Sequence, residues 1–145
     1  MKKQNKFILM IFLLLSLTNM VFAENNFFEE GLKKYKEKKY DDSKFLFQRS
    51  LVFNPKEINS YLYLAKIYNF EKNKNEEEKN VNTVLLLDPK NEEAIYMLME
   101  IELKRSNYIK VKELSENFSK VCKKICEKKN LILNSLKNLE SKNES

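Results

Sequence analysis

The chain has 145 residues, enough for one small domain and a targeting segment. One glycine and two prolines are too few for the many tight turns of a β-sandwich, and 43% apolar residues favour helices joined by short turns. The formal charge of +6 is mixed with many acidic residues, whereas nucleic-acid binding needs a concentrated basic face, so we expect no nucleic-acid partner.

Residues 1–23 have the pattern of a secretory signal peptide. Three lysines, half of the net charge, precede an apolar run over 7–17, and Val21 and Ala23 occupy positions −3 and −1 of a cleavage site after Ala23. The alternative is an uncleaved anchor, but 7–22 falls short of the roughly 20 residues that span a bilayer. We therefore predict an exported protein, in a bacterial periplasm, from which the leader has been removed.

Two proline-containing pairs, Asn54-Pro55 and Asp88-Pro89, stand 34 residues apart. Each follows an apolar run and precedes a new segment with helical spacing. Because proline has no backbone N–H and disfavours helix in the residue before it, each pair marks the end of a helix. A period of 34 with helix–turn–helix content resembles the tetratricopeptide repeat family. The resemblance implies an all-α fold, a right-handed superhelix of about three helical hairpins with a C-terminal capping helix.

The first unit, residues 25–56, alternates aromatic and small residues as this family does. Two antiparallel helices pack closely only where small residues let the backbones approach, and large rings fill the gaps beside them. We expect helices over 25–37 and 41–54. The matching residues are Phe27, Gly31, Tyr40, Ser43, Phe47 and Ser50.

The second unit, 57–90, departs from the pattern at its middle, where Lys74 and Glu77 replace an aromatic and a small residue. A buried, unpaired carboxylate is costly, so we expect the start of the second helix to be shifted, frayed or exposed. The helices are predicted over 57–70 and 75–87. The matching residues are Tyr61, Leu64, Ala65, Tyr68, Val81 and Val84.

The third unit, 91–122, matches less well, because Lys123 stands where the proline belongs. Asn91 is predicted to be an N-cap, and helices are predicted over 92–104 and 108–121. The matching residues are Ile95, Leu98, Met99, Tyr108, Val111 and Phe118.

Residues 123–141 are predicted to carry the capping helix, over 127–141, because repeat arrays need an amphipathic helix over their exposed end. Its apolar stripe comprises Ile132, Leu136 and Leu139. Residues 142–145 are predicted to be a frayed tail.

Cys122 and Cys126 fall where the turn after the third unit belongs. An even pair of cysteines in an exported protein predicts a disulfide, which here would clip the turn. The alternative is one continuous helix, because apolar residues continue in a heptad-like series over 111–139 without glycine or proline. That helix would place both cysteines on one face, where a bridge is strained. The pattern alone does not decide between the two.

The sequence lacks the residues and motifs that commonly form an active site. The chain has no histidine and no glycine-rich phosphate loop, and two thiolates without histidine cannot complete a tetrahedral zinc site. We predict no catalytic residue, no cofactor and no metal.

The family resemblance implies a concave groove lined by the first helix of each unit. The residues at the corresponding positions would form a mostly apolar, aromatic surface suited to an amphipathic helix or extended peptide. With Lys66 and Glu100 as its polar points, this surface does not resemble the family's carboxylate clamp, which is built from lysine, arginine and asparagine. The alternative is that the same rings are covered by the N-terminal residues or another subunit. The groove residues are Phe28, Leu32, Tyr35, Leu62, Lys66, Asn69, Tyr96, Glu100 and Leu103.

Two functional hypotheses follow. The first is a periplasmic adaptor whose groove holds a segment of another envelope protein. The second is a membrane-tethered structural subunit that retains the leader and lays four lysines on anionic lipid, so membrane contact is expected only if the leader is retained. These lysines are Lys120, Lys123, Lys124 and Lys128.

Overall fold

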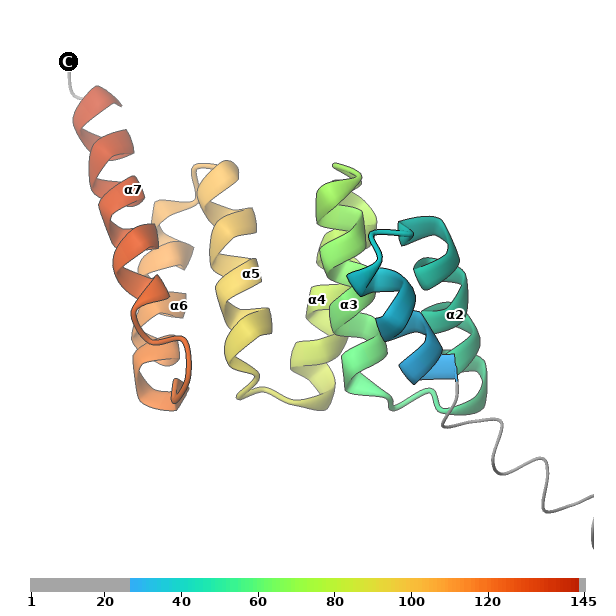
Figure 1. Ribbon diagram of the computed structural model, residues 1–145. Helices are drawn as coiled ribbons and strands as arrows, with labels where there is room; N and C mark the ends of the chain where they lie inside the picture. The colour runs from blue at the N-terminus through green and yellow to red at the C-terminus, as the bar shows by residue number, and fades with distance from the viewer. Residues whose placement is uncertain (1–26, 144–145) are drawn as a thin grey trace, which may run out of the picture. The chain divides into compact units, whose positions relative to one another are not determined.

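The computed structural model describes residues 27–143, which form helices joined by short turns and contain no strand (Figure 1). The all-α fold class is confirmed. The described residues form two compact units, one up to Ser60 and one from Tyr61. The signal peptide and the cleavage site predicted at the N-terminus lie outside the described residues.

The first unit pairs a helical segment over 27–36 with α2 (Tyr40–Phe53). Ser43 Oγ donates a hydrogen bond of 2.9 Å to the carbonyl oxygen of Gly31, so the two backbones lie close together. A Cβ atom on Gly31 would lie 2.9 Å from two ring carbons of the fully buried Phe47. The small residues and the ring therefore do what the sequence pattern predicts of them.

The second compact unit, which begins at Tyr61 and extends beyond the second repeat, holds most of α3 and the four helices that follow. Asparagines cap three of these helices, because the side chains of Asn73, Asn91 and Asn107 each accept a hydrogen bond from the backbone N–H three residues later. The helices are α3 (Ile58–Phe70), α4 (Lys74–Leu87), α5 (Glu92–Lys104), α6 (Tyr108–Val121) and α7 (Lys128–Asn143).

The turn inside each hairpin repeats with the same period. Lys38, Lys72 and Ser106 have φ values of 60°, in the left-handed region that favours glycine, and they are 34 residues apart in sequence. The three repeats thus share the backbone conformation of this turn, although the residue type differs between Lys38 and Ser106. This repeat cannot be recognised in the sequence, because none of the three residues is glycine.

The main core of the second compact unit lies where α5, α6 and α7 meet. The helix α7 packs against both α5 and α6, alongside which it runs in Figure 1, and Leu139 of its predicted stripe is 36% exposed. The buried residues of this core cluster are Ile95, Met99, Val111, Leu114, Phe118, Ile132 and Leu136.

A turn over residues 122–127 separates α6 from α7. The continuous-helix alternative is therefore wrong. Cys122 acts as the C-cap of α6 with extended backbone, and its N–H donates to the carbonyl oxygen of Phe118. The helix ends although its apolar pattern continues, because the chain reverses to bury Ile132 and Leu136 against α5 and α6.

Candidate partner-binding site

The helices α3 and α5 carry the predicted groove residues of the second compact unit, which begins at Tyr61. Lys66 of α3 forms a 2.8 Å ion pair with Glu93 of α5, and its ammonium also lies 4.5 Å from the centre of the Tyr63 ring. The charge of Lys66 is therefore already matched inside the protein, and the pair joins the two helices. Leu62, also on α3, is only 6% exposed and offers little surface to a partner.

Asn69 and Glu77 correct the prediction for the middle of the second repeat. Glu77 is 3% exposed, well inside α4, and accepts a hydrogen bond from Asn69 Nδ2. The start of α4 is not shifted, because Asn73 caps the helix, and its first residues, Lys74 and Asn75, are exposed as predicted. Glu77, by contrast, is buried because its carboxylate has a partner. Asn69 is thus a packing residue between α3 and α4, whatever it contributes to a groove.

Tyr96 is the central aromatic residue of the α5 face. Its burial and, next, the nearby Glu100 carboxylate raise the pKa of its hydroxyl. The ammonium of Lys128, the first residue of α7, lies 5.0 Å from the ring centre. Tyr96 and Leu103 are half-buried against the core cluster. This part of α5 therefore presents an aromatic ring with a carboxylate on one side and a lysine above it.

The predicted residues of the first unit are also partly used in packing. The Phe28 ring lies 5.7 Å from that of Phe47, and the Tyr35 ring lies 5.6 Å from that of Tyr40. Phe28, Leu32 and Tyr35 are all half-buried, so each leaves part of its side chain accessible.

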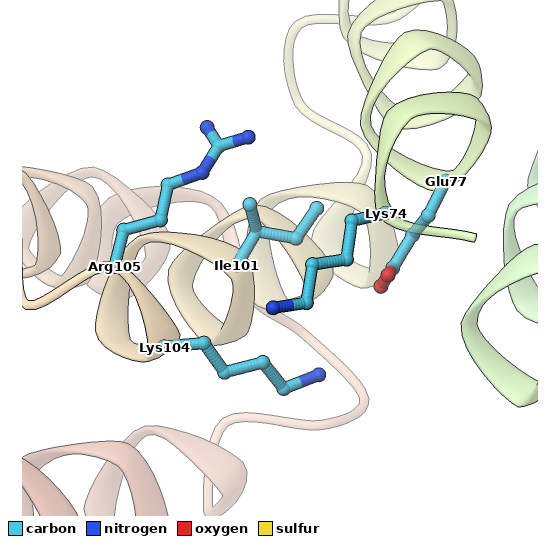
Figure 2. A pocket seen from close by; sticks show the side chains of 5 residues that line it. All are labelled: Lys74, Glu77, Ile101, Lys104 and Arg105. Carbon is cyan, nitrogen blue, oxygen red and sulfur yellow. The ribbon is translucent and has the colours of Figure 1, made fainter. Parts of the chain in front are cut away.

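A small pocket of about 30 Å³ lies between α4 and the end of α5 (Figure 2). The Arg105 guanidinium turns away from the lysines in Figure 2 and pairs with both oxygens of Glu78, which lowers the pKa of Glu78 and raises that of Arg105. A space of this size holds about one water molecule, so we assign it no ligand. Its lining residues are Lys74, Glu77, Ile101, Lys104 and Arg105.

The turn over 122–127 is bonded to α5 through a residue that sequence reasoning missed. Glu92 Oε2 accepts hydrogen bonds from the backbone N–H groups of Lys124, at 2.9 Å, and Ile125, at 3.2 Å. The N–H groups of Lys123 and Lys124 lower the pKa of Glu92. The only sequence signal was the acidic first turn of α5, which equally suits the helix dipole.

Cys122 and Cys126 lie in disulfide geometry within this turn, with their Cα atoms 5.4 Å apart. Within residues 27–143 there is no cluster of three or more potential metal ligands. None of the helices in this part of the chain combines the length and the apolar character that crossing a membrane requires.

The four lysines of the membrane hypothesis are not equivalent. Lys120, Lys123 and Lys124 are exposed, whereas Lys128 is half-buried over the Tyr96 ring. A flat lipid surface therefore has at most three of the four available to it without disturbing α7.

No model of a known protein family matches this sequence, and no curated protein matches it. Solved structures do. The TPR2B domain of yeast Sti1, in a complex with pHsp70, has a TM-score of 0.71 at 10% identity and covers 81% of this chain and 98% of its own. The Sgt2 TPR domain from Aspergillus fumigatus has a TM-score of 0.69 at 16% identity, over 85% of this chain and 83% of its own.

A bacterial structure is similar to the same extent. The Yersinia enterocolitica type III secretion chaperone SycD, in complex with a peptide of the translocator YopD, has a TM-score of 0.68 at 15% identity. The match covers 82% of this chain and 93% of SycD. At such identities the likeness shows the fold alone. The chain has the tetratricopeptide-repeat fold, the all-α arrangement of helical hairpins that its 34-residue period predicts.

Proposed function

We propose that this chain is a non-enzymatic adaptor that binds a peptide or helix of a partner protein on the first helices of its repeats. The observation that carries the proposal is the fold. Two similar structures with this fold, yeast Sti1 and Yersinia SycD, contain pHsp70 and a YopD peptide, respectively. Repeat folds take such segments through apolar anchors spaced along one face.

The chemistry of α5 supports an amphipathic or extended segment over a free carboxylate terminus. Tyr96 supplies an aromatic anchor, and Glu100 lies beside its hydroxyl. Lys66, the cation of the predicted groove, is already paired with Glu93. A carboxylate clamp needs free cations, and a partner carboxylate here would have to displace Glu93 and also approach Glu100.

Site-specific photocrosslinking in cells tests the proposal. Probes replace Tyr96 on α5 and Phe28 on the 27–36 helix, and the control probe replaces the exposed Glu116 on α6. We expect one discrete adduct with another protein from Tyr96 or Phe28 and none from Glu116. Adducts only with a second copy of the chain, or equal labelling from Glu116, would refute the adaptor.

We further propose that the adaptor works outside the cytoplasm, in a bacterial envelope, and that its partner is another envelope protein. The support is the leader pattern over residues 1–23. Mass spectrometry of the N-terminal peptide from the soluble envelope fraction is the test, and a product beginning at Glu24 is expected. A full-length chain confined to the membrane fraction would contradict export with cleavage and favour the tethered subunit.

A further inference from the structure

The turn that carries the two cysteines is also the attachment of α7 to α5. Lys124 and Ile125, whose N–H groups bind Glu92, both lie between Cys122 and Cys126. Ile125 and Cys122 also pack against the core cluster. A bridge between the cysteines restricts the backbone of this short loop, and the loop in turn presents two amides to one carboxylate on α5.

The same attachment places α7 over a predicted binding residue. Lys128, at the start of α7, lies over the Tyr96 ring, and Ile132 and Leu136 are buried with residues of α5 and α6. Lys129, which follows Lys128 in the chain, donates a 2.7 Å hydrogen bond to Ser119 of α6. These contacts of α7 therefore depend on where the 122–127 turn places the start of the helix.

We propose that the Cys122–Cys126 bridge is a redox-sensitive clasp that holds the start of α7 against α5, and that its reduction uncovers Tyr96. The clasp itself needs no partner. Its use as a regulator of binding rests on the proposed adaptor function.

Reduction of the bridge requires a dithiol reductant, such as a thioredoxin-like protein. Cys126 is exposed and Cys122 half-buried, so the attacking thiolate reaches the sulfur of Cys126 and displaces the Cys122 thiolate. The reductant's second thiol then resolves the mixed disulfide. The products are two cysteine thiols, which take up the two protons of the dithiol, and the oxidised reductant. The freed loop gains conformational entropy and no longer holds its amides toward Glu92.

Hydrogen exchange of the full chain in its oxidised and reduced forms tests the clasp. We expect the amides of α7 to exchange about tenfold faster after reduction, whereas those of α2, in the other unit, serve as the internal control and do not change. Glu92→Gln weakens the same attachment without altering sulfur and should raise α7 exchange in the oxidised protein. Glu116→Gln, which removes a charge from the exposed face of α6, is its control.

Tyrosine nitration by tetranitromethane reports on Tyr96 directly. Because this reagent oxidises thiols, the oxidised protein is compared with the Cys122→Ser, Cys126→Ser double variant. The peptide containing Tyr96 should be nitrated about tenfold faster in the variant, since the burial that raises the pKa of its hydroxyl is relieved when the start of α7 moves away. Tyr35, in the first unit, is the internal control.

The outcomes separate the clasp from the adaptor. Equal α7 exchange and equal Tyr96 nitration in the compared forms would overturn the clasp, whether or not a partner binds. Two free thiols in the intact mass of protein isolated with thiols blocked would overturn it as well. Faster exchange and nitration without any crosslinked partner would support the clasp and remove only its link to binding.

Discussion

The first hairpin, 27–36 with α2, and the third, α5 with α6, fill equivalent repeat positions with residues of opposite size. Gly31 and Phe47 of the first correspond to Met99 and Ser115 of the third. All four are buried. The large side chain has moved from the second helix to the first, so that the pair still fills the space between two helices.

The third unit therefore still folds as a hairpin although its large and small residues at these two positions are exchanged relative to the first. Close packing conserves the summed volume at a contact and leaves its division between the helices free.

Met99→Ala should destabilise the third hairpin most. Met99 is fully buried in the core cluster, and removing its side chain leaves a cavity there. We expect a loss of about 3 kcal/mol in the free energy of unfolding, measured by urea denaturation. Met99→Leu conserves volume and should cost less than about 1.5 kcal/mol. Equal losses for the two variants would contradict the volume argument.

Gly31→Ala should destabilise the first hairpin, where the equivalent position has no room. The new Cβ would lie 2.9 Å from the Phe47 ring, so we expect a loss of about 2 kcal/mol. Without that crowding, alanine would instead stabilise the helix by about 1 kcal/mol. The sign of the change in the free energy of unfolding, measured by urea denaturation, therefore shows whether crowding against Phe47 outweighs the higher helix propensity of alanine. The loss should shrink in a Phe47→Leu background.

Asn69→Ala should cost about 1 kcal/mol, because it leaves the buried Glu77 carboxylate without its amide donor. Glu77 stands where the first hairpin has Ser43 and the third has Val111. Replacing Asn69 with leucine and Glu77 with valine together should recover most of the loss in thermal denaturation. If the double variant were less stable than Asn69→Ala, the polar pair would be required for the packing of α3 on α4.

Glu92→Gln should change how stability depends on pH. Its carboxylate pKa lies below the ordinary value of 4.5 in the folded protein, so the charged form contributes stability above that value and loses it as the pH falls through the folded pKa. The difference between wild type and Glu92→Gln should be constant near neutral pH and shrink below about pH 4.5. Glu116→Gln is the charge-matched control. A difference that grew on acidification would contradict the assignment.

Lys38→Gly, Lys72→Gly and Ser106→Gly should each stabilise the protein slightly. Their φ values of 60° strain any residue with a Cβ atom, and glycine removes that strain at some cost in unfolded-state entropy. The expected gain is about 0.5 kcal/mol in thermal denaturation. Lys90→Gly, at an exposed turn residue outside this group, should bring no gain. A loss at all three positions would show that the turns are not strained.

The helices were predictable because their signals are local. The predicted ranges end within two residues of α2, α3, α4, α5, α6 and α7 as the structure has them. Prolines, asparagine caps and apolar spacing act on the residues around them, so the sequence contains this information in order. The 34-residue period then predicted how successive helices pair.

The predicted site was less accessible to sequence reasoning. The family positions predict a binding face on α3 and α5, which stays a prediction, and they gave no sign that Lys66 is paired with Glu93 or that Lys128 lies over Tyr96. Those partners come from other helices. The position of a residue in the repeat indicates which face of its own helix it lies on. It does not indicate which residues of other helices contact that side chain.

The helical class, the repeat period and the approximate bounds of the helices α2 to α7 thus follow from local sequence patterns. Tertiary structure alone decided which polar side chains are already used within the protein. Glu92 meets backbone amides 32 residues away, and Asn69 meets Glu77 across a turn. Helix propensity depends on covalent neighbours, whereas the partner of a carboxylate depends on distance in space, which exists only once the helices have packed.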